Sequence, residues 1–173
     1  MKHFGFLVLI LIFFTACKST SSIVTSKKSD LKKERVTKTE KRKTNRLAEE
    51  LIDAAAENLG VKYKYAGTTK AGYDCSGLMY TIFDSHNITL PRNSYQQSKV
   101  GEVINTKNKE AQKGDLIFFK TNKNSQINHV GIVIEVSDDE IKFIHSSTSK
   151  GVIISSTKEP YYKKTFVQLN RIL

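Results

Sequence analysis

The sequence predicts an α+β domain in which N-terminal helices pack on an antiparallel sheet of five to six strands. Two stretches with apolar residues at helical spacing come first, at residues 47–59 and 75–86. Runs rich in β-branched and aromatic residues follow, and Asp138-Asp139 forms a turn between two of them. The length of 173 residues suits one such domain.

Local signals define where the predicted helices begin and end. Asn45 is a suitable N-cap for the first helix, and Gly60 is a natural stop after it. The second helix is expected to start at Cys75 and to end before Asn87. A short helical turn is expected at residues 94–99. The predicted strands cover residues 115–119, 130–136, 140–145, 151–155 and 166–173.

The first 17 residues have the layout of a secretory signal. Lys2 supplies a positive start, residues 4–14 form an apolar run that is short for a membrane span, and Thr15-Ala16-Cys17 closes the segment. This ending resembles the lipobox of bacterial lipoproteins, although Phe14 stands where that family usually has an aliphatic residue. The resemblance implies that Cys17 becomes the lipidated, palmitate-bearing first residue of a protein anchored at the periplasmic side or outer membrane. An uncleaved anchor is the alternative.

The positive charge of the chain is concentrated near its N-terminus. Residues 1–46 carry twelve Lys and Arg against three acids, a net charge of +9, whereas residues 47–173 carry a net charge of +2. Residues 18–46 contain almost no apolar side chains, so we expect a basic, disordered tether that is either attracted to anionic lipids and wall polymers or simply solvated. The tether lacks aromatic residues on which bases could stack, which argues against nucleic-acid binding.

Cys75 is the candidate nucleophile. If Cys17 carries a lipid, Cys75 has no partner for a disulfide, which is unusual in an exported protein. At the first turn of a helix, the helix dipole favours a thiolate, the reactive form of cysteine. The small residues Ser76-Gly77 after it are expected to let an extended substrate approach closely.

Two histidines are candidate partners for this cysteine. His129 and His145 lie at ends of strands that the turn at 138–139 would pair, whereas His86 has no apparent partner. An imidazole activates a thiolate and protonates the leaving group, and a second polar group fixes its tautomer. Taken alone, Cys75 is explained as a small buried residue and each histidine as a structural residue at a strand end. A zinc site is the other reading of a Cys/His/His trio, but no Cys-x-x-Cys spacing supports it.

From residue 47 to the C-terminus, the chain resembles the NlpC-type cell-wall cysteine peptidases, a branch of the papain-like superfamily. Six motifs carry the resemblance, in the order found in that family: Tyr63-Lys-Tyr-Ala-Gly67, Asp74-Cys-Ser-Gly-Leu78, Leu90-Pro-Arg-Asn-Ser94, Lys113-Gly-Asp-Leu-Ile-Phe-Phe119, His129-Val-Gly-Ile132 and Phe143-Ile-His-Ser-Ser147. The resemblance implies a papain-like fold for residues 47–173.

The resemblance also assigns roles to single residues. It implies Cys75 as nucleophile, His129 as general base and acid, and His145 as the residue that orients His129. The remaining positions are expected to line the oxyanion site or bind substrate, with core packing or a structural role as the alternative: Tyr63 for the oxyanion, and Asp74, Ser76 and Arg92 on the substrate side. No metal or organic cofactor is expected.

The family cleaves amide bonds in peptidoglycan stem peptides, typically between D-glutamate and the diamino acid. The resemblance therefore implies a monomeric, lipid-anchored murein endopeptidase. One alternative is an amidase or acyltransferase of the same fold that acts on another amide or ester. A non-catalytic wall-binding lipoprotein is the other, although such a module has no need for all of Cys75, His129 and His145.

Replacing Cys17 tests the anchor. We expect Cys17→Ala to release the protein into the soluble fraction or to leave an unprocessed precursor, because the site of lipid attachment is lost. Membrane fractionation and intact mass of the variant and the wild type measure this. Unchanged membrane partitioning together with unchanged mature size would contradict lipidation.

Overall fold

A computed structural model describes residues 23–104, 111–123 and 126–173, with side chains from residue 37 onward. The expected signal segment and Cys17 lie outside the described residues. The helices are α1 (Ile23–Ala56), α2 (Cys75–Asp84), α3 (Ser94–Gln97) and α4 (Pro160–Thr165). The strands are β1 (Thr68–Thr69), β2 (Gly72–Tyr73), β3 (Glu102–Ile104), β4 (Leu116–Phe119), β5 (His129–Val136), β6 (Ile141–Ser147), β7 (Gly151–Ser156) and β8 (Phe166–Arg171).

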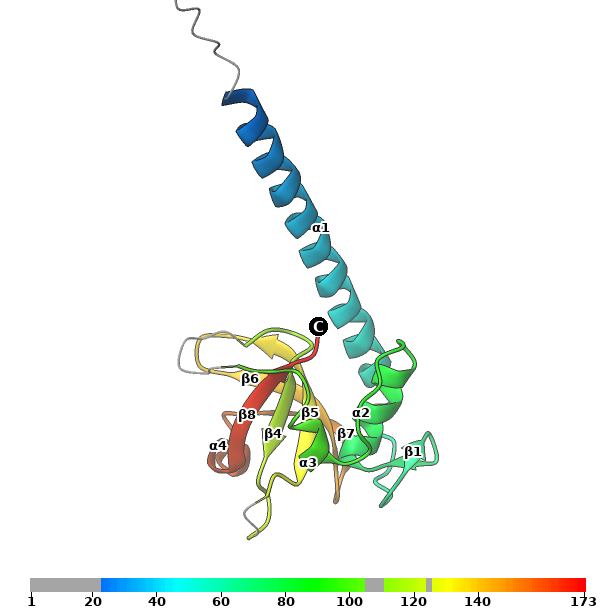
Figure 1. Cartoon of the computed structure of the whole chain (residues 1–173). Helices are drawn as coiled ribbons and strands as arrows, with labels where there is room; N and C mark the ends of the chain where they lie inside the picture. Colours follow the sequence, from blue (N-terminus) through cyan, green and yellow to red (C-terminus); the bar gives the residue numbers. More distant parts are fainter. Residues whose placement is uncertain (1–22, 105–110, 124–125) are drawn as a thin grey trace, which may run out of the picture. The chain divides into compact units, whose positions relative to one another are not determined.

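Helix α1 starts much earlier than predicted. The expected start near Asn45 and the expected disorder across residues 23–46 are wrong, because α1 is helical from Ile23 (Figure 1). A scarcity of apolar residues argues against burial but not against a helix, and this stretch holds many Lys, Arg and Glu with no Gly or Pro. No helix among the described residues is both long and apolar enough to cross a membrane.

The contacts divide the chain after Thr39, and the unit Glu40–Leu173 contains the sheet. Its six strands follow the order β3-β8-β4-β5-β6-β7 with antiparallel pairing throughout, so the prediction of an α+β fold with a five- to six-stranded antiparallel sheet is confirmed. The five predicted strands, the helix at Cys75 and the helical turn at Ser94 are all present. The short strands β1 to β3 and helix α4 were not predicted.

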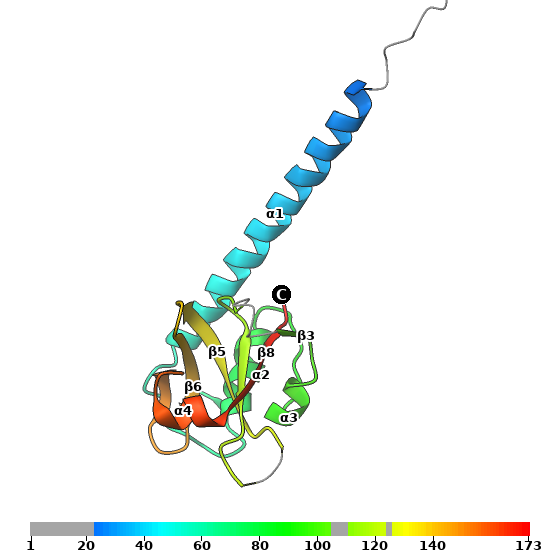
Figure 2. The same ribbon diagram turned by 90° about the vertical axis from the view of Figure 1, so that its left-hand side faces the viewer.

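Both faces of the central strand β4 are buried, and helices contribute side chains to the apolar cluster on each face. Alternating residues of β4 point to opposite faces, with Leu116 and Phe118 in one apolar cluster and Ile117 and Phe119 in the other. The first cluster includes buried residues of α1 and α2, and the second includes Tyr162 of α4. Figures 1 and 2 show α2 and α4 as separate elements beside the strands.

One ion pair is nearly enclosed at the start of β4. Asp115 is only 2% exposed, and both of its carboxylate oxygens accept hydrogen bonds from the Arg171 guanidinium, at 3.0 and 2.9 Å. The Gln112 N–H donates to the same carboxylate at 2.8 Å. This contact joins the end of β8 to the turn that precedes β4.

Removing the cation should leave a buried charge without its main partner. We expect Arg171→Ala to lower the free energy of unfolding by about 3–5 kcal/mol. Lys142→Ala is the control, since the Lys142–Glu135 pair is exposed and its loss should cost less than about 1 kcal/mol. Chemical denaturation of both variants measures the difference, and equal small effects would show that Asp115 does not depend on Arg171.

Candidate active site

The N-terminus of α2 positions Cys75. Asp74 is the N-cap residue, in extended conformation, and its Oδ1 accepts a hydrogen bond of 2.6 Å from the Gly77 N–H. Such a cap holds the first turn of a helix in place. Cys75 is therefore the first residue of α2, at the end of the helix where unpaired N–H groups and the helix dipole favour negative charge.

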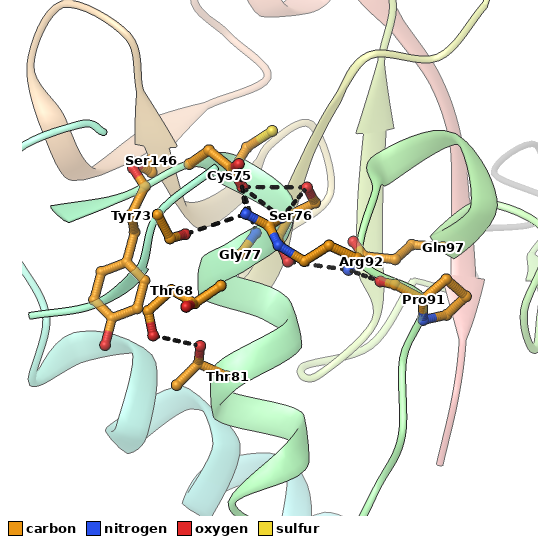
Figure 3. Close-up of polar contacts among 12 residues, drawn as sticks. Thr68, Tyr73, Cys75, Ser76, Gly77, Thr81, Pro91, Arg92, Gln97 and Ser146 are labelled. Carbon is orange, nitrogen blue, oxygen red and sulfur yellow. Dashed lines mark hydrogen bonds and ion pairs between the residues drawn. The ribbon is translucent and has the colours of Figure 1, made fainter. Parts of the chain in front are cut away.

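Arg92 ties a second segment to this cap. Its guanidinium donates to both oxygens of Asp74, at 3.0 and 2.7 Å, and to the Ser76 hydroxyl at 3.1 Å (Figure 3). It also donates to the main-chain oxygen of Gly67 at 3.4 Å. Arg92 and Asp74 thus form a two-pronged ion pair with each other. In Figure 3 the Cys75 sulfur points away from the contacts of Arg92.

Gly77 serves the packing of the backbone. An added Cβ would lie 2.0 Å from the Gly67 carbonyl oxygen, and Gly77 is buried. The expectation that Gly77 leaves room for a substrate is therefore wrong, because the loop before Cys75 fills that space. Gly67 is equally constrained, since its added Cβ would lie 2.2 Å from the Gly72 carbonyl oxygen.

Cys75 packs against the residue that precedes His129. The thiol lies 3.9 Å from the main-chain oxygen of Asn128, the geometry of a weak S–H···O hydrogen bond. The Asn128 side chain is fixed by Thr121, whose N–H donates to Asn128 Oδ1 at 2.7 Å and whose hydroxyl accepts from Asn128 Nδ2 at 2.9 Å. Within the described residues Cys75 forms no disulfide and is 9% exposed.

Burial raises the pKa of the Cys75 thiol to about 11, and the nearby Asp74 carboxylate adds to this rise. The backbone N–H groups of Val130 on β5 and of Ser76 and Cys75 at the start of α2 act in the opposite direction, but their effect is smaller. The resting group is consequently a thiol, and a base must remove its proton when it attacks.

The pairing of β5 with β6 brings His129 and His145 together. His129 Nε2 and His145 Nδ1 share a hydrogen bond of 2.8 Å, with the rings nearly perpendicular. Gly131 makes this possible, because a Cβ there would lie 3.1 Å from His145 Cβ and 2.7 Å from the Ile144 carbonyl oxygen. With Nε2 engaged, Nδ1 is the ring nitrogen of His129 that remains for another group.

Both imidazoles are neutral at rest. Burial lowers the pKa of His129 to about 4 and that of His145 to about 3, where the nearby His129 contributes as well. His145 is fully buried, and its other nitrogen, Nε2, lies 3.0 Å from the Ser155 hydroxyl and 3.1 Å from the Tyr162 hydroxyl.

Two hollows lie near the start of β5, where Asn128 lines the first and His129 the second. Residues of the α2 start and of the loops around it line the first hollow: Tyr63, Tyr65, Asp74, Cys75, Ser76, Arg92, Asn93 and Ser94. Residues of the β6–β7 turn and of α4 line the second, among them Ser147, Lys150, Glu159 and Tyr161.

The structure brings the predicted site residues to this region. Burial raises the pKa of the Tyr63 hydroxyl, and the negative charge of a nearby Cys75 thiolate would add to this rise. Asp74, Ser76 and Arg92 line the same hollow as Cys75, but they also hold one another. Among the described residues, no group of three or more His, Cys, Asp or Glu is placed to hold a metal ion.

Three residues of the site were not predicted from the sequence: Asn128, Ser155 and Tyr162. For Asn128, the one signal in the sequence is that it directly precedes the predicted catalytic residue His129. Ser155 and Tyr162 come from β7 and α4, and no local pattern connects them to His145.

The neutral histidines predict how stability depends on pH. In the folded protein both pKa values lie below the ordinary 6.5, so between pH 6.5 and about 4 the unfolded chain binds more protons. The free energy of unfolding should therefore fall as the pH falls through this range. Near pH 5, the slope of the free energy of unfolding against pH should be smaller in His145→Gln, by the amount that corresponds to about one bound proton. Denaturation at several pH values measures the slope, and an unchanged slope would contradict a neutral buried His145.

Comparison with known proteins identifies the family. Residues 60–171 match the model of the NlpC/P60 family. A murein DD-endopeptidase MepS/murein LD-carboxypeptidase of Escherichia coli is 39% identical over 124 residues, which cover 71% of this chain and 62% of that protein. A gamma-D-glutamyl-L-lysine dipeptidyl-peptidase of Bacillus cereus is 36% identical over 73% of this chain and 37% of its own length.

A solved structure shares the fold. The crystal structure of an NlpC/P60 family protein from Bacillus cereus superposes with a TM-score of 0.64 and 37% identity, covering 73% of this chain and 40% of that one. The chain therefore spans less than two thirds of the length of these relatives. The family match, the identities and the shared fold agree, and the chain belongs to the NlpC/P60 family.

Proposed function

We propose that this protein is a cysteine peptidase that hydrolyses amide bonds in peptidoglycan stem peptides. One observation carries the proposal: Cys75 starts a helix beside the residue that precedes His129, and His129 shares a 2.8 Å hydrogen bond with the buried His145. A nucleophile, a base and a group that orients the base are the parts that acyl transfer by a cysteine requires.

In the first step, the Cys75 sulfur attacks the substrate carbonyl carbon while its proton passes to His129 Nδ1. The resulting oxyanion is stabilised by the Cys75 N–H at the start of α2 and by the Tyr63 hydroxyl. The His129 imidazolium then donates its proton to the leaving nitrogen. The C–N bond breaks, the amine departs and a thioester on Cys75 remains.

In the second step, a water molecule attacks the thioester and gives a proton to His129. The C–S bond breaks, the new carboxylic acid leaves, and the proton on His129 returns to the sulfur. The high pKa of Cys75 and the low pKa of His129 keep the proton on sulfur between turnovers. Proton transfer therefore accompanies attack on the carbonyl.

The two hollows suit a peptide that occupies both of them and passes Cys75 and His129 on the way. The hollow with Tyr63 and Asp74 would hold the acyl side, and the hollow beyond His129 would hold the leaving amine. We propose the bond between D-glutamate and the diamino acid, in keeping with the name of the Bacillus cereus relative. The name of the Escherichia coli relative favours a DD bond as the second candidate.

We also propose a location for this activity at the bacterial cell envelope. The apolar run of residues 4–14 and the Thr15-Ala16-Cys17 ending support export and lipidation of Cys17. A lipid anchor would keep the enzyme near a polymer through which it cannot diffuse. The helical, basic segment after it would favour anionic surfaces.

Muropeptide digestion tests the activity. We expect the wild type to cleave purified muropeptides, and Cys75→Ala and His129→Ala to lose cleavage by at least about a thousandfold, because no nucleophile or base replaces them. Mass spectrometry of the products identifies the broken bond and so decides between the γ-glutamyl and DD candidates.

His86→Ala is the matched control, because His86 bonds the Ile82 carbonyl on α2 and lies outside both hollows. It should cleave at nearly the wild-type rate. Intact muropeptides with the folded wild type, or equal cleavage by Cys75→Ala, would refute the proposed function.

A further inference from the structure

We propose that Ser155 and Tyr162 are positioning residues whose hydroxyl oxygens accept a hydrogen bond from the Nε2–H of His145 while His129 is charged. This inference rests on the proposed function, in which His129 takes the proton of Cys75. It extends the site by two hydroxyl groups from β7 and α4, beyond the cysteine and the two histidines.

The geometry puts both hydroxyls at one nitrogen. His145 Nδ1 faces His129 at 2.8 Å, whereas His145 Nε2 faces Ser155 Oγ at 3.0 Å and Tyr162 Oη at 3.1 Å. Ser155 (4% exposed) and Tyr162 (8% exposed) line the second hollow beside His129, whereas His145 itself is fully buried. The protein itself must therefore supply a partner for Nε2.

The charged state of His129 determines the direction of each hydrogen bond. An imidazolium donates from both nitrogens, so His129 Nε2–H must donate to His145 Nδ1. A neutral His145 that accepts at Nδ1 carries its own proton on Nε2. That N–H then needs an acceptor, and the oxygens of Ser155 and Tyr162 are both within reach.

In the resting state the order of donors is free to reverse, because hydroxyl groups both donate and accept. A reversed chain would place a proton on His145 Nδ1 and leave His129 protonated at Nδ1, where it cannot receive the proton of Cys75. The two hydroxyls are thus of most consequence when His129 becomes charged, and each can replace the other as acceptor.

Tyr162 is held for this task by the surrounding rings. Its ring packs edge-on against Phe119 and Phe143, with centroid distances of 5.3 and 5.1 Å. Tyr162→Phe keeps these contacts and removes only the hydroxyl. Ser155→Ala likewise removes a single hydroxyl from β7, so the pair of variants isolates the hydrogen bonds from the packing.

A double-mutant cycle tests the proposal. Each single variant should lower kcat/KM for muropeptides by less than about threefold, because the other hydroxyl remains. The double variant Ser155→Ala/Tyr162→Phe should lower it by about tenfold to a hundredfold, since a buried N–H then lacks an acceptor. A loss in the double variant no larger than the product of the single losses would overturn the proposal.

Alkylation of Cys75 by iodoacetamide near neutral pH gives a readout without peptidoglycan. It requires the same proton transfer to His129, so its rate should fall in the double variant by a similar factor at an unchanged melting temperature. The control Ser156→Ala/Tyr95→Phe removes two hydroxyls away from His145, and should alkylate at the wild-type rate.

The two assays separate this inference from the proposed function. If the wild type leaves muropeptides intact but the double variant is alkylated more slowly than the wild type, the proposed function is refuted and the role of the hydroxyls is supported. Unchanged alkylation in the folded double variant would overturn the role of the hydroxyls, whatever the activity on muropeptides.

Discussion

The Asp74 carboxylate is the group on which the geometry around Cys75 depends. It caps α2 through the Gly77 N–H and accepts both arms of the Arg92 guanidinium, so the helix start and the segment after Pro91 are held by one side chain. Arg92 also balances its charge. A carboxylate beside the sulfur would otherwise oppose a thiolate still more strongly than Asp74 does now.

Burial acts on the two halves of the site in opposite directions. It raises the pKa of Cys75 and lowers that of His129, and both changes keep the proton on sulfur in the free protein. Desolvation thus keeps the Cys75 thiol and the His129 imidazole neutral in the free protein. The thiolate and the imidazolium form only when a substrate carbonyl is present. The entry into strand β5 links the halves, since Asn128 just before the strand contacts the sulfur and His129 contacts His145.

Much of the fold could be predicted because its signals are local. The runs that form β4 to β8 are β-branched and aromatic, and apolar residues at helical spacing mark α2. The extent of α1 could not be predicted from apolar periodicity, because residues 23–46 are helical by backbone propensity. The role of Gly77 was also misread, since the approach of Gly67 to α2 is a long-range contact.

The sequence by itself determined the order of the elements, the nucleophile candidate Cys75 and the histidines 129 and 145, because capping, periodicity and motif spacing are local properties. Only the tertiary structure decided which ring nitrogens of the two histidines share a hydrogen bond and which hydroxyls bond the other nitrogen of His145. It also decided that Asp74 and Arg92 pair with each other. These contacts join β7, α4 and the loop after α2 across the sheet. Distances of about 3 Å between such segments depend on packing, which no local pattern of residues encodes.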